Sequence, residues 1–156
     1  MIDFFGTRKR KFKSWLEDEI QQGLVMQQDT NGHWFIYLSS NLDELLEDQS
    51  FVIRLSTDMK GVVCRANLAL NLEANSMLIG DIKSNVENRG YGSLVLKNII
   101  KQAKEIGVKE VVGNLSKIDS DHFDKLEYFY SKHGFDVSFY NSRTEGRIVL
   151  NLNRNL

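Results

Sequence analysis

Apolar positions in this chain follow two different spacings, and the switch between them marks the predicted elements. The apolar run at 77–82 is short and nearly continuous, which predicts a mostly buried strand. After a polar loop the apolar residues return at helical spacing: Leu96, Ile99, Ile100, Ala103 and Ile106. Gly107 follows them, as glycine often does at the end of a helix. Residues 76–107 therefore predict a strand, a glycine loop and a helix, around which the other elements are arranged.

The remaining segments extend this unit on both sides. Helices are predicted at 7–22, 41–50 and 121–133, and strands at 24–29, 33–39, 51–55, 61–72, 108–115, 135–140 and 147–152. Asn31-Gly32 predicts a hairpin turn between the first two strands. Three successive strands ending at 77–82 favour an antiparallel meander, and a right-handed crossover places 108–115 parallel to 77–82. The predicted fold class is mixed α/β (α+β), with one sheet that is antiparallel at both ends.

Length and charge narrow the class of protein. The 156 residues suit one domain with a sizeable core, and 42% of them are apolar. A net charge of -1 disfavours nucleic acid and membranes as partners. No apolar run approaches the ~20 residues of a membrane span, and the first residues lack the order of a signal peptide. We therefore expect a cytoplasmic protein.

Two local features have an ordinary interpretation and a functional one. Cys64 is the only cysteine, which excludes an internal disulfide, and it shares the apolar face of its strand. A buried small hydrophobe is favoured there over a catalytic nucleophile. The basic run at 8–13 is interpreted as the solvated end of a helix. RNA binding through this run is the least favoured of the functions considered for the protein.

The glycine loop before the central helix carries the first chemical signal. Gly90 and Gly92 let the backbone approach a ligand closely, and the helix behind them offers unpaired N–H groups. A pyrophosphate would fit such a site, although the loop could also be only a tight connection. A Walker loop is excluded because Gly-Lys-Ser/Thr is absent, and Val95 stands where a Rossmann loop has its third glycine.

Two motifs resemble the GNAT N-acetyltransferases. Glu87-Asn88-Arg89-Gly90-Tyr91-Gly92 is similar to the Gln/Arg-x-x-Gly-x-Gly/Ala loop with which that family holds the pyrophosphate of acetyl-coenzyme A, with Glu87 in place of Gln or Arg. The segment 129–135 is similar to the family's FYxKxGF helix end. The resemblance implies a single GNAT-like domain at 1–156, with a variable N-terminal part at 1–50 and an acetyl-CoA-binding core at 51–152.

The resemblance also implies a coenzyme site and an acid. Two parallel strands would splay apart, with pantetheine pairing to the backbone of Ile82, Lys83 and Ser84. The pyrophosphate would lie against the loop residues Glu87, Asn88, Arg89, Gly90, Tyr91, Gly92 and Ser93. Tyr130 takes the position of the family's general acid and would be protonated at neutral pH, since a phenol has a pKa near ~10. From periodicity alone, Tyr130 would instead be a core residue of its helix.

The general base is not assigned by either line of reasoning. Family members that use a carboxylate carry it where this chain has Ser76. Glu73 lies one turn before that position, and strict alternation gives Asp81 the opposite face from Ser76. Both are candidates, and ordered water could replace a base. The family's pantetheine-binding Asn is also absent, because Phe123 occupies its position.

We therefore expect an acetyl-CoA-dependent N-acetyltransferase that modifies a primary amine by direct attack. The amine would be a small molecule or a peptide, with acetyl-CoA as co-substrate and no metal. A homodimer and a monomer are both compatible with the sequence. The alternative is a non-catalytic GNAT-like domain that binds acyl-CoA or a regulatory partner, a hypothesis supported by Glu87, Phe123 and the unassigned base.

Overall fold

The computed structural model describes residues 27–28, 34–38, 50–57, 61–85 and 90–153, with side chains at 64–85 and 90–153. The predicted helices at 7–22 and 41–50 lie outside these residues. So do the hairpin turn at Asn31-Gly32 and the loop residues Glu87, Asn88 and Arg89. These predictions stay predictions.

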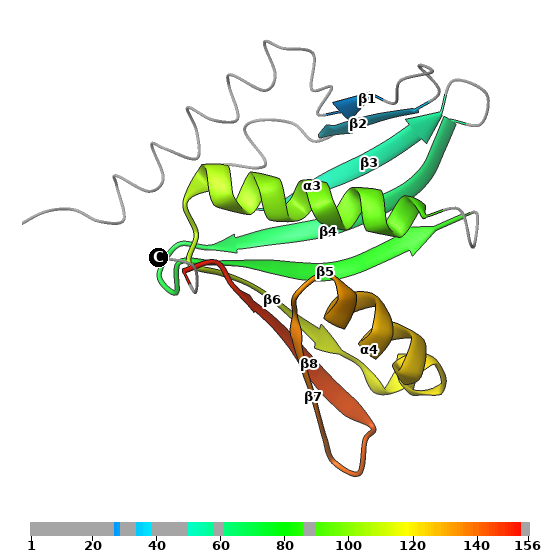
Figure 1. Cartoon of the computed structure of the whole chain (residues 1–156), viewed down its shortest axis with the longest axis vertical. Helices are drawn as coiled ribbons and strands as arrows, with labels where there is room; N and C mark the ends of the chain where they lie inside the picture. The colour runs from blue at the N-terminus through cyan, green and yellow to red at the C-terminus, as the bar shows by residue number, and fades with distance from the viewer. Residues whose placement is uncertain (1–26, 29–33, 39–49, 58–60, 86–89, 154–156) are drawn as a thin grey trace, which may run out of the picture.

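The described elements form one mixed sheet with helices packed on it (Figure 1). Their order is β1 (Gln27–Gln28), β2 (Trp34–Leu38), β3 (Ser50–Thr57), β4 (Gly61–Asn71), β5 (Ser76–Ser84), α3 (Tyr91–Ile106), β6 (Glu110–Leu115), the 3₁₀ helix η1 (Lys117–His122), α4 (Phe123–Lys132), β7 (Asp136–Tyr140) and β8 (Glu145–Asn151). The sheet has eight described strands in the order β1-β2-β3-β4-β5-β6-β8-β7. In this part of the chain, no helix has the length and apolar character that crossing a membrane requires.

The predicted strand pairing is confirmed. Strands β1 to β5 form an antiparallel series, β5 and β6 run parallel, and β6, β8 and β7 are again antiparallel. The parallel pair follows from the α3 crossover between its two strands. The antiparallel pairs β3–β4, β4–β5 and β7–β8 have short connections, such as the turn at 141–144, whereas η1, α4 and β7 lie between β6 and its antiparallel partner β8.

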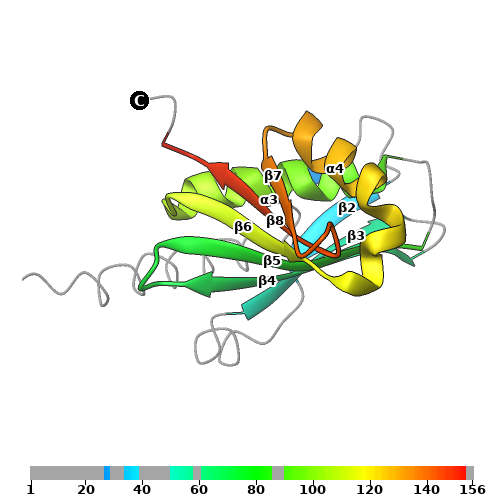
Figure 2. The ribbon, with the colours of Figure 1, turned by 90° about the horizontal axis from the view of Figure 1, so that it is seen from below.

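Helix α3 forms the centre of the core. It packs across β3 to β6, and Figure 2 shows it running along one face of the sheet. Of the residues that the helical spacing predicted on its apolar face, Leu96, Ile99 and Ala103 are fully buried, whereas Ile100 and Ile106 are only partly buried. Val95, Asn98 and Gln102 are also buried. Gly107 ends the helix in a left-handed conformation (φ 88°), and its N–H bonds the Ala103 carbonyl. The sequence therefore located this helix and its end correctly.

The second described helix begins differently from the prediction. The segment predicted as one helix over 121–133 begins as the 3₁₀ helix η1 and becomes α-helical at Phe123. The Asp119 N–H bonds the Ser116 carbonyl at 3.0 Å, and the Ser116 hydroxyl donates to the Asp119 carboxylate at 3.1 Å. This backbone bond and this side-chain bond favour a tight first turn, which apolar periodicity does not reveal.

Candidate active site

The two parallel strands separate halfway along β5. Pairing between β5 and β6 runs from Ser76–Glu110 to Ile79–Gly113 and ends there, whereas β5 stays paired with β4 as far as Ser84. Figure 1 shows β5 and β6 diverging from this point toward the end of the molecule that carries α4. The edge of β5 that faces β6 therefore has no strand partner from Gly80 onward within the described residues. The splayed parallel pair expected from the GNAT resemblance is present.

A β-bulge at Gly80 coincides with the separation. Leu68 of β4 pairs with Ile79, and the adjacent Asn67 pairs with Asp81. Gly80 therefore has no partner on β4 and is the extra residue of the bulge. Directly opposed residues share a face of the sheet. Asp81 therefore lies on the face of Asn67, which is also the face of Leu78 and Ser76. The expectation that Asp81 faces away from Ser76 was wrong, because it assumed uninterrupted alternation.

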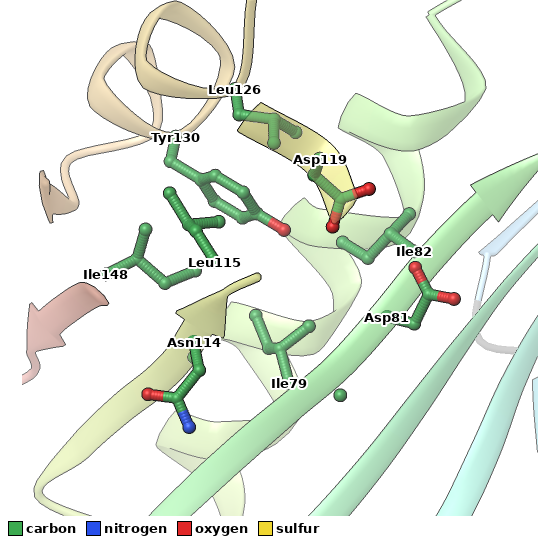
Figure 3. A pocket seen from close by; sticks show the side chains of 11 residues that line it. Ile79, Asp81, Ile82, Asn114, Leu115, Asp119, Leu126, Tyr130 and Ile148 are labelled. Carbon is green, nitrogen blue, oxygen red and sulfur yellow. The ribbon is translucent and has the colours of Figure 1, made fainter. Parts of the chain in front are cut away.

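A cavity of about 120 Å³ lies in the opening between the strands (Figure 3). Its volume far exceeds the ~15 Å³ that one water molecule requires, so side chains do not close the gap. Residues from both separating strands, η1, α4 and β8 form its wall: Ile79, Gly80, Asp81, Ile82, Gly113, Asn114, Leu115, Asp119, Leu126, Tyr130 and Ile148. The predicted residues Tyr130, Asp81 and Ile82 are thus brought together, and Asn114 joins them although it was not predicted at this site.

Tyr130 extends from α4 into this cavity. The side chain is 6% exposed, and its ring packs edge-on against Phe129 and Phe135 with centroid distances of 5.0 and 5.4 Å. Its hydroxyl points into the opening (Figure 3) and has no hydrogen-bond partner among the described residues. Burial raises the pKa of Tyr130 to about 12, with further contributions from the charges of Asp81 and Asp119. The phenol is both a packed core residue and a proton donor available to the cavity.

Two carboxylates share the wall with Tyr130. The Asp81 carboxylate has the Lys83 ammonium at 3.3 Å, and both side chains are well exposed, so this pair is weak. Asp119 receives the Ser116 hydroxyl and has no basic partner among the described residues. No role for Asp119 was predicted from the sequence. Its place beside Tyr130 depends on how η1 turns back over the end of β6.

Glu73 lies away from this cavity. It is exposed in the turn that joins β4 to β5, before the paired half of β5 begins. It is not among the cavity-lining residues, and the opening lies at the other end of the strand. Of the two carboxylates considered as a base, only Asp81 therefore lines the cavity with Tyr130.

The N-terminus of α3 presents free amides near this site. Gly90 adopts the left-handed conformation (φ 74°), and the first helical bond joins the Leu94 N–H to the Gly90 carbonyl at 3.1 Å. The N–H groups of Tyr91, Gly92 and Ser93 precede that bond, and no described residue accepts from them. These amides have the arrangement that favours an anion at a helix N-terminus.

The end of α4 packs directly on the start of α3. A Cβ on Gly92 would lie 3.5 Å from the Phe129 ring, and His133 Nε2 lies 3.1 Å from Ser93 Oγ. The His133 ring also packs edge-on against Phe129. Burial, with the charges of Lys132 and Lys97, lowers the pKa of His133 below its ordinary value. This contact joins the helix of Tyr130 to the glycine loop across 40 residues, a distance over which sequence spacing gives no signal.

Known proteins with this architecture were compared with the chain. No family model matches it. The uncharacterized protein YocC of Bacillus subtilis is 29% identical over 125 residues, which is 80% of this chain and 73% of YocC. A Bacillus subtilis acetyltransferase solved with CoA has a TM-score of 0.59 at 17% identity, covering 75% of this chain and 97% of that protein. The chain has the GNAT acetyltransferase fold.

Two further structures carry the same fold. A GNAT family acetyltransferase from Elizabethkingia anophelis, solved with acetyl-CoA, has a TM-score of 0.60 at 16% identity and covers 77% of this chain and 99% of its own. The PaiA N-acetyltransferase of Thermoplasma acidophilum, solved with coenzyme A, has a TM-score of 0.55 at 18% identity over 70% of this chain and 68% of its own. The sequence resemblance to GNAT proteins is thus confirmed at the level of the fold.

Proposed function

We propose that this protein transfers the acetyl group of acetyl-CoA to a primary amine by direct attack. The observation that carries this proposal is the cavity at which β5 and β6 separate, with the buried Tyr130 hydroxyl directed into it. A closed sheet or a bonded phenol would leave no room for a thioester and no proton for its sulfur. The fold itself is shared with acetyltransferases, but a fold alone does not determine an activity.

The coenzyme would lie along two sets of backbone groups. The N–H groups of Tyr91, Gly92 and Ser93 would bind the pyrophosphate at the positive end of α3. The open edge of β5 at Ile82 and Lys83 would pair with the amide groups of pantetheine, as an added strand does. The contributions of Ser84, Glu87, Asn88 and Arg89 stay predictions from the sequence.

Acetyl transfer then requires a balanced movement of two protons. A neutral amine attacks the thioester carbon and forms the C–N bond, and the C–S bond breaks as the tetrahedral intermediate collapses. The departing thiolate takes the Tyr130 proton. The excess proton of the nitrogen returns to the phenolate through water, so the products are an amide and a thiol. Asp81 is the favoured group to take the proton of an incoming ammonium, because it lines the cavity and Glu73 does not.

The proposal is tested by separating binding from turnover. We expect acetyl-CoA at about 100 times its Kd to stabilise the protein by about 2.7 kcal/mol, which is several degrees in Tm. S-acetylpantetheine, which lacks the pyrophosphate, should stabilise it much less at the same concentration. Thiol release across a panel of primary amines then measures transfer.

Each outcome of this test has a distinct meaning. Stabilisation by acetyl-CoA together with amine-dependent thiol release supports the proposal. Stabilisation without release from any amine would favour the non-catalytic acyl-CoA-binding module instead. Absence of any thermal shift would rule out the coenzyme site itself.

A further inference from the structure

We propose that the acceptor is a small amine with a second positive charge, and that Asp119 is the residue that selects it. This inference rests on the proposed function and concerns the same cavity. It assigns a substrate class, a short dication of the diamine type, and a specificity-determining residue that the sequence did not identify.

The charge of the cavity wall is one-sided. Among its eleven lining residues, Asp81 and Asp119 have acidic side chains, and none has a basic side chain. The other side chains of the lining residues are apolar except for those of Asn114 and Tyr130. A cation entering here would therefore find two anionic partners, although Asp119 is exposed to solvent and the Asp81 side chain is 44% exposed.

The two carboxylates are not equivalent. Lys83 lies 3.3 Å from Asp81, which offsets part of the charge of that group. Asp119 accepts one neutral hydrogen bond from Ser116, and no ammonium or guanidinium of the described residues balances it. Asp119 is thus the better partner for a permanent positive charge, while Asp81 is the group that could accept a proton from the reacting nitrogen.

The buried phenol marks the reacting end of the site. Tyr130 is 6% exposed, and its unpartnered hydroxyl is directed into the space that Asp81 and Asp119 border (Figure 3). Burial is the largest cause of the raised pKa of Tyr130, and the charges of both carboxylates add to it. A bound cation would offset the contribution of these two charges to the pKa of Tyr130, while the larger effect of burial would stay. The arrangement therefore favours a substrate that supplies positive charge where the acid must act.

The experiment compares two acceptors of equal length with the whole protein and saturating acetyl-CoA. One is 1,4-diaminobutane, and the other is 4-amino-1-butanol, which replaces the second ammonium by a hydroxyl. We expect kcat/KM to be at least tenfold higher for the diamine, because its second ammonium adds a charge–charge attraction to the hydrogen bond with Asp119, which a hydroxyl does not. The difference should lie mainly in KM.

Variants then assign the preference to one side chain. Asp119→Asn keeps an acceptor for the Ser116 hydroxyl and should reduce the diamine preference about tenfold, through a higher KM for the diamine. Asp119→Glu keeps the charge and should retain most of the preference. Asp121→Asn is the matched control, since it removes the same charge from an exposed residue of η1 outside the cavity wall.

The results distinguish this inference from the function on which it rests. Equal kcat/KM for both amines, or equal losses in Asp119→Asn and Asp121→Asn, would overturn the substrate assignment and leave acetyl transfer intact. Loss of both activities in equal measure in Asp119→Asn would also overturn it. Absence of thiol release with every amine would overturn the proposed function and this inference together.

Discussion

The two halves of strand β5 face very different surroundings. The first half, Ser76–Ile79, pairs with β4 on one edge and β6 on the other, and Met77 and Ile79 are buried under α3. The second half, from Gly80 to Ser84, keeps β4 but has no partner on its other edge among the described residues. One half holds the sheet together, and the other leaves backbone groups and carboxylates open to a cavity. A single strand can thus serve both the core and the site when its neighbour turns away.

The largest test of this division is Tyr130→Phe, at the open half. Removing the hydroxyl should lower kcat by about 10²–10⁴-fold, the range expected for loss of a positioned general acid. The ring would still pack between Phe129 and Phe135, so Tm and the Kd for acetyl-CoA should change little. Steady-state kinetics and thermal unfolding measure the two effects. Full activity in this variant would remove Tyr130 from the mechanism.

The converse test is Met77→Ala, at the paired half. Met77 is 0% exposed, and its truncation should lower the free energy of unfolding by about 2–5 kcal/mol. Asp81→Asn, four residues along the strand, should change that free energy by only about 0.5 kcal/mol, because its side chain is well exposed. Urea unfolding of the two variants measures the contrast. Similar losses of unfolding free energy in both variants would mean that the open half of β5 contributes to stability as much as the paired half.

The sequence predicts the paired half better than the open one, for a physical reason. The apolar run at 77–82 and the helical spacing of α3 reflect burial, because buried positions carry apolar residues. The face on which Asp81 lies depends on the bulge at Gly80, and a bulge changes alternation without changing polarity. A glycine inside a strand was the available signal for it.

The rest of the site depends on contacts between distant segments. Asp119 reaches the cavity because η1 turns back at the end of β6, and His133 meets Ser93 across the surfaces of two helices. Neither contact leaves a periodic trace in the chain. Tyr130 was found because a whole motif around it resembled a known helix end, although periodicity alone assigned it to the core. It satisfies both interpretations, being buried and directed into the cavity.

The dependence of unfolding free energy on alkaline pH tests whether water reaches the buried side chains beside the open half of β5. Burial raises the pKa of Cys64, which lies opposite Ser84, from 9.0 to about 11, and that of Tyr130 from 10.0 to about 12. Each group stays protonated longer in the folded state, so its stabilising effect is complete below its unfolded pKa and is lost as pH rises toward its folded pKa. The relevant windows are pH 9 to 11 for the thiol and 10 to 12 for the phenol.

The expected sizes follow from those windows. Between pH 9 and 11 the wild-type protein should lose about 2 kcal/mol more than Cys64→Ala and about 1 kcal/mol more than Tyr130→Phe. Urea unfolding at pH 9, 10 and 11 measures these differences. Parallel pH profiles for all three proteins would show that water reaches both groups in the folded state.

The smallest expected effect lies at the point of separation, where Gly113 of β6 is the last residue paired with β5. A Cβ at Gly113 would lie 3.0 Å from two carbons of Ile148 and 3.2 Å from the Ile79 carbonyl oxygen, so Gly113→Ala presses on the backbone of β5. We expect a loss of about 1 kcal/mol, or roughly 2–4 °C in Tm. Gly80→Ala is the matched control, because its Cβ meets only Asn67 at the ordinary distances of 3.5 and 3.7 Å. If Gly80→Ala were the more damaging change, the bulge rather than the close approach at Gly113 would fix where the strands part.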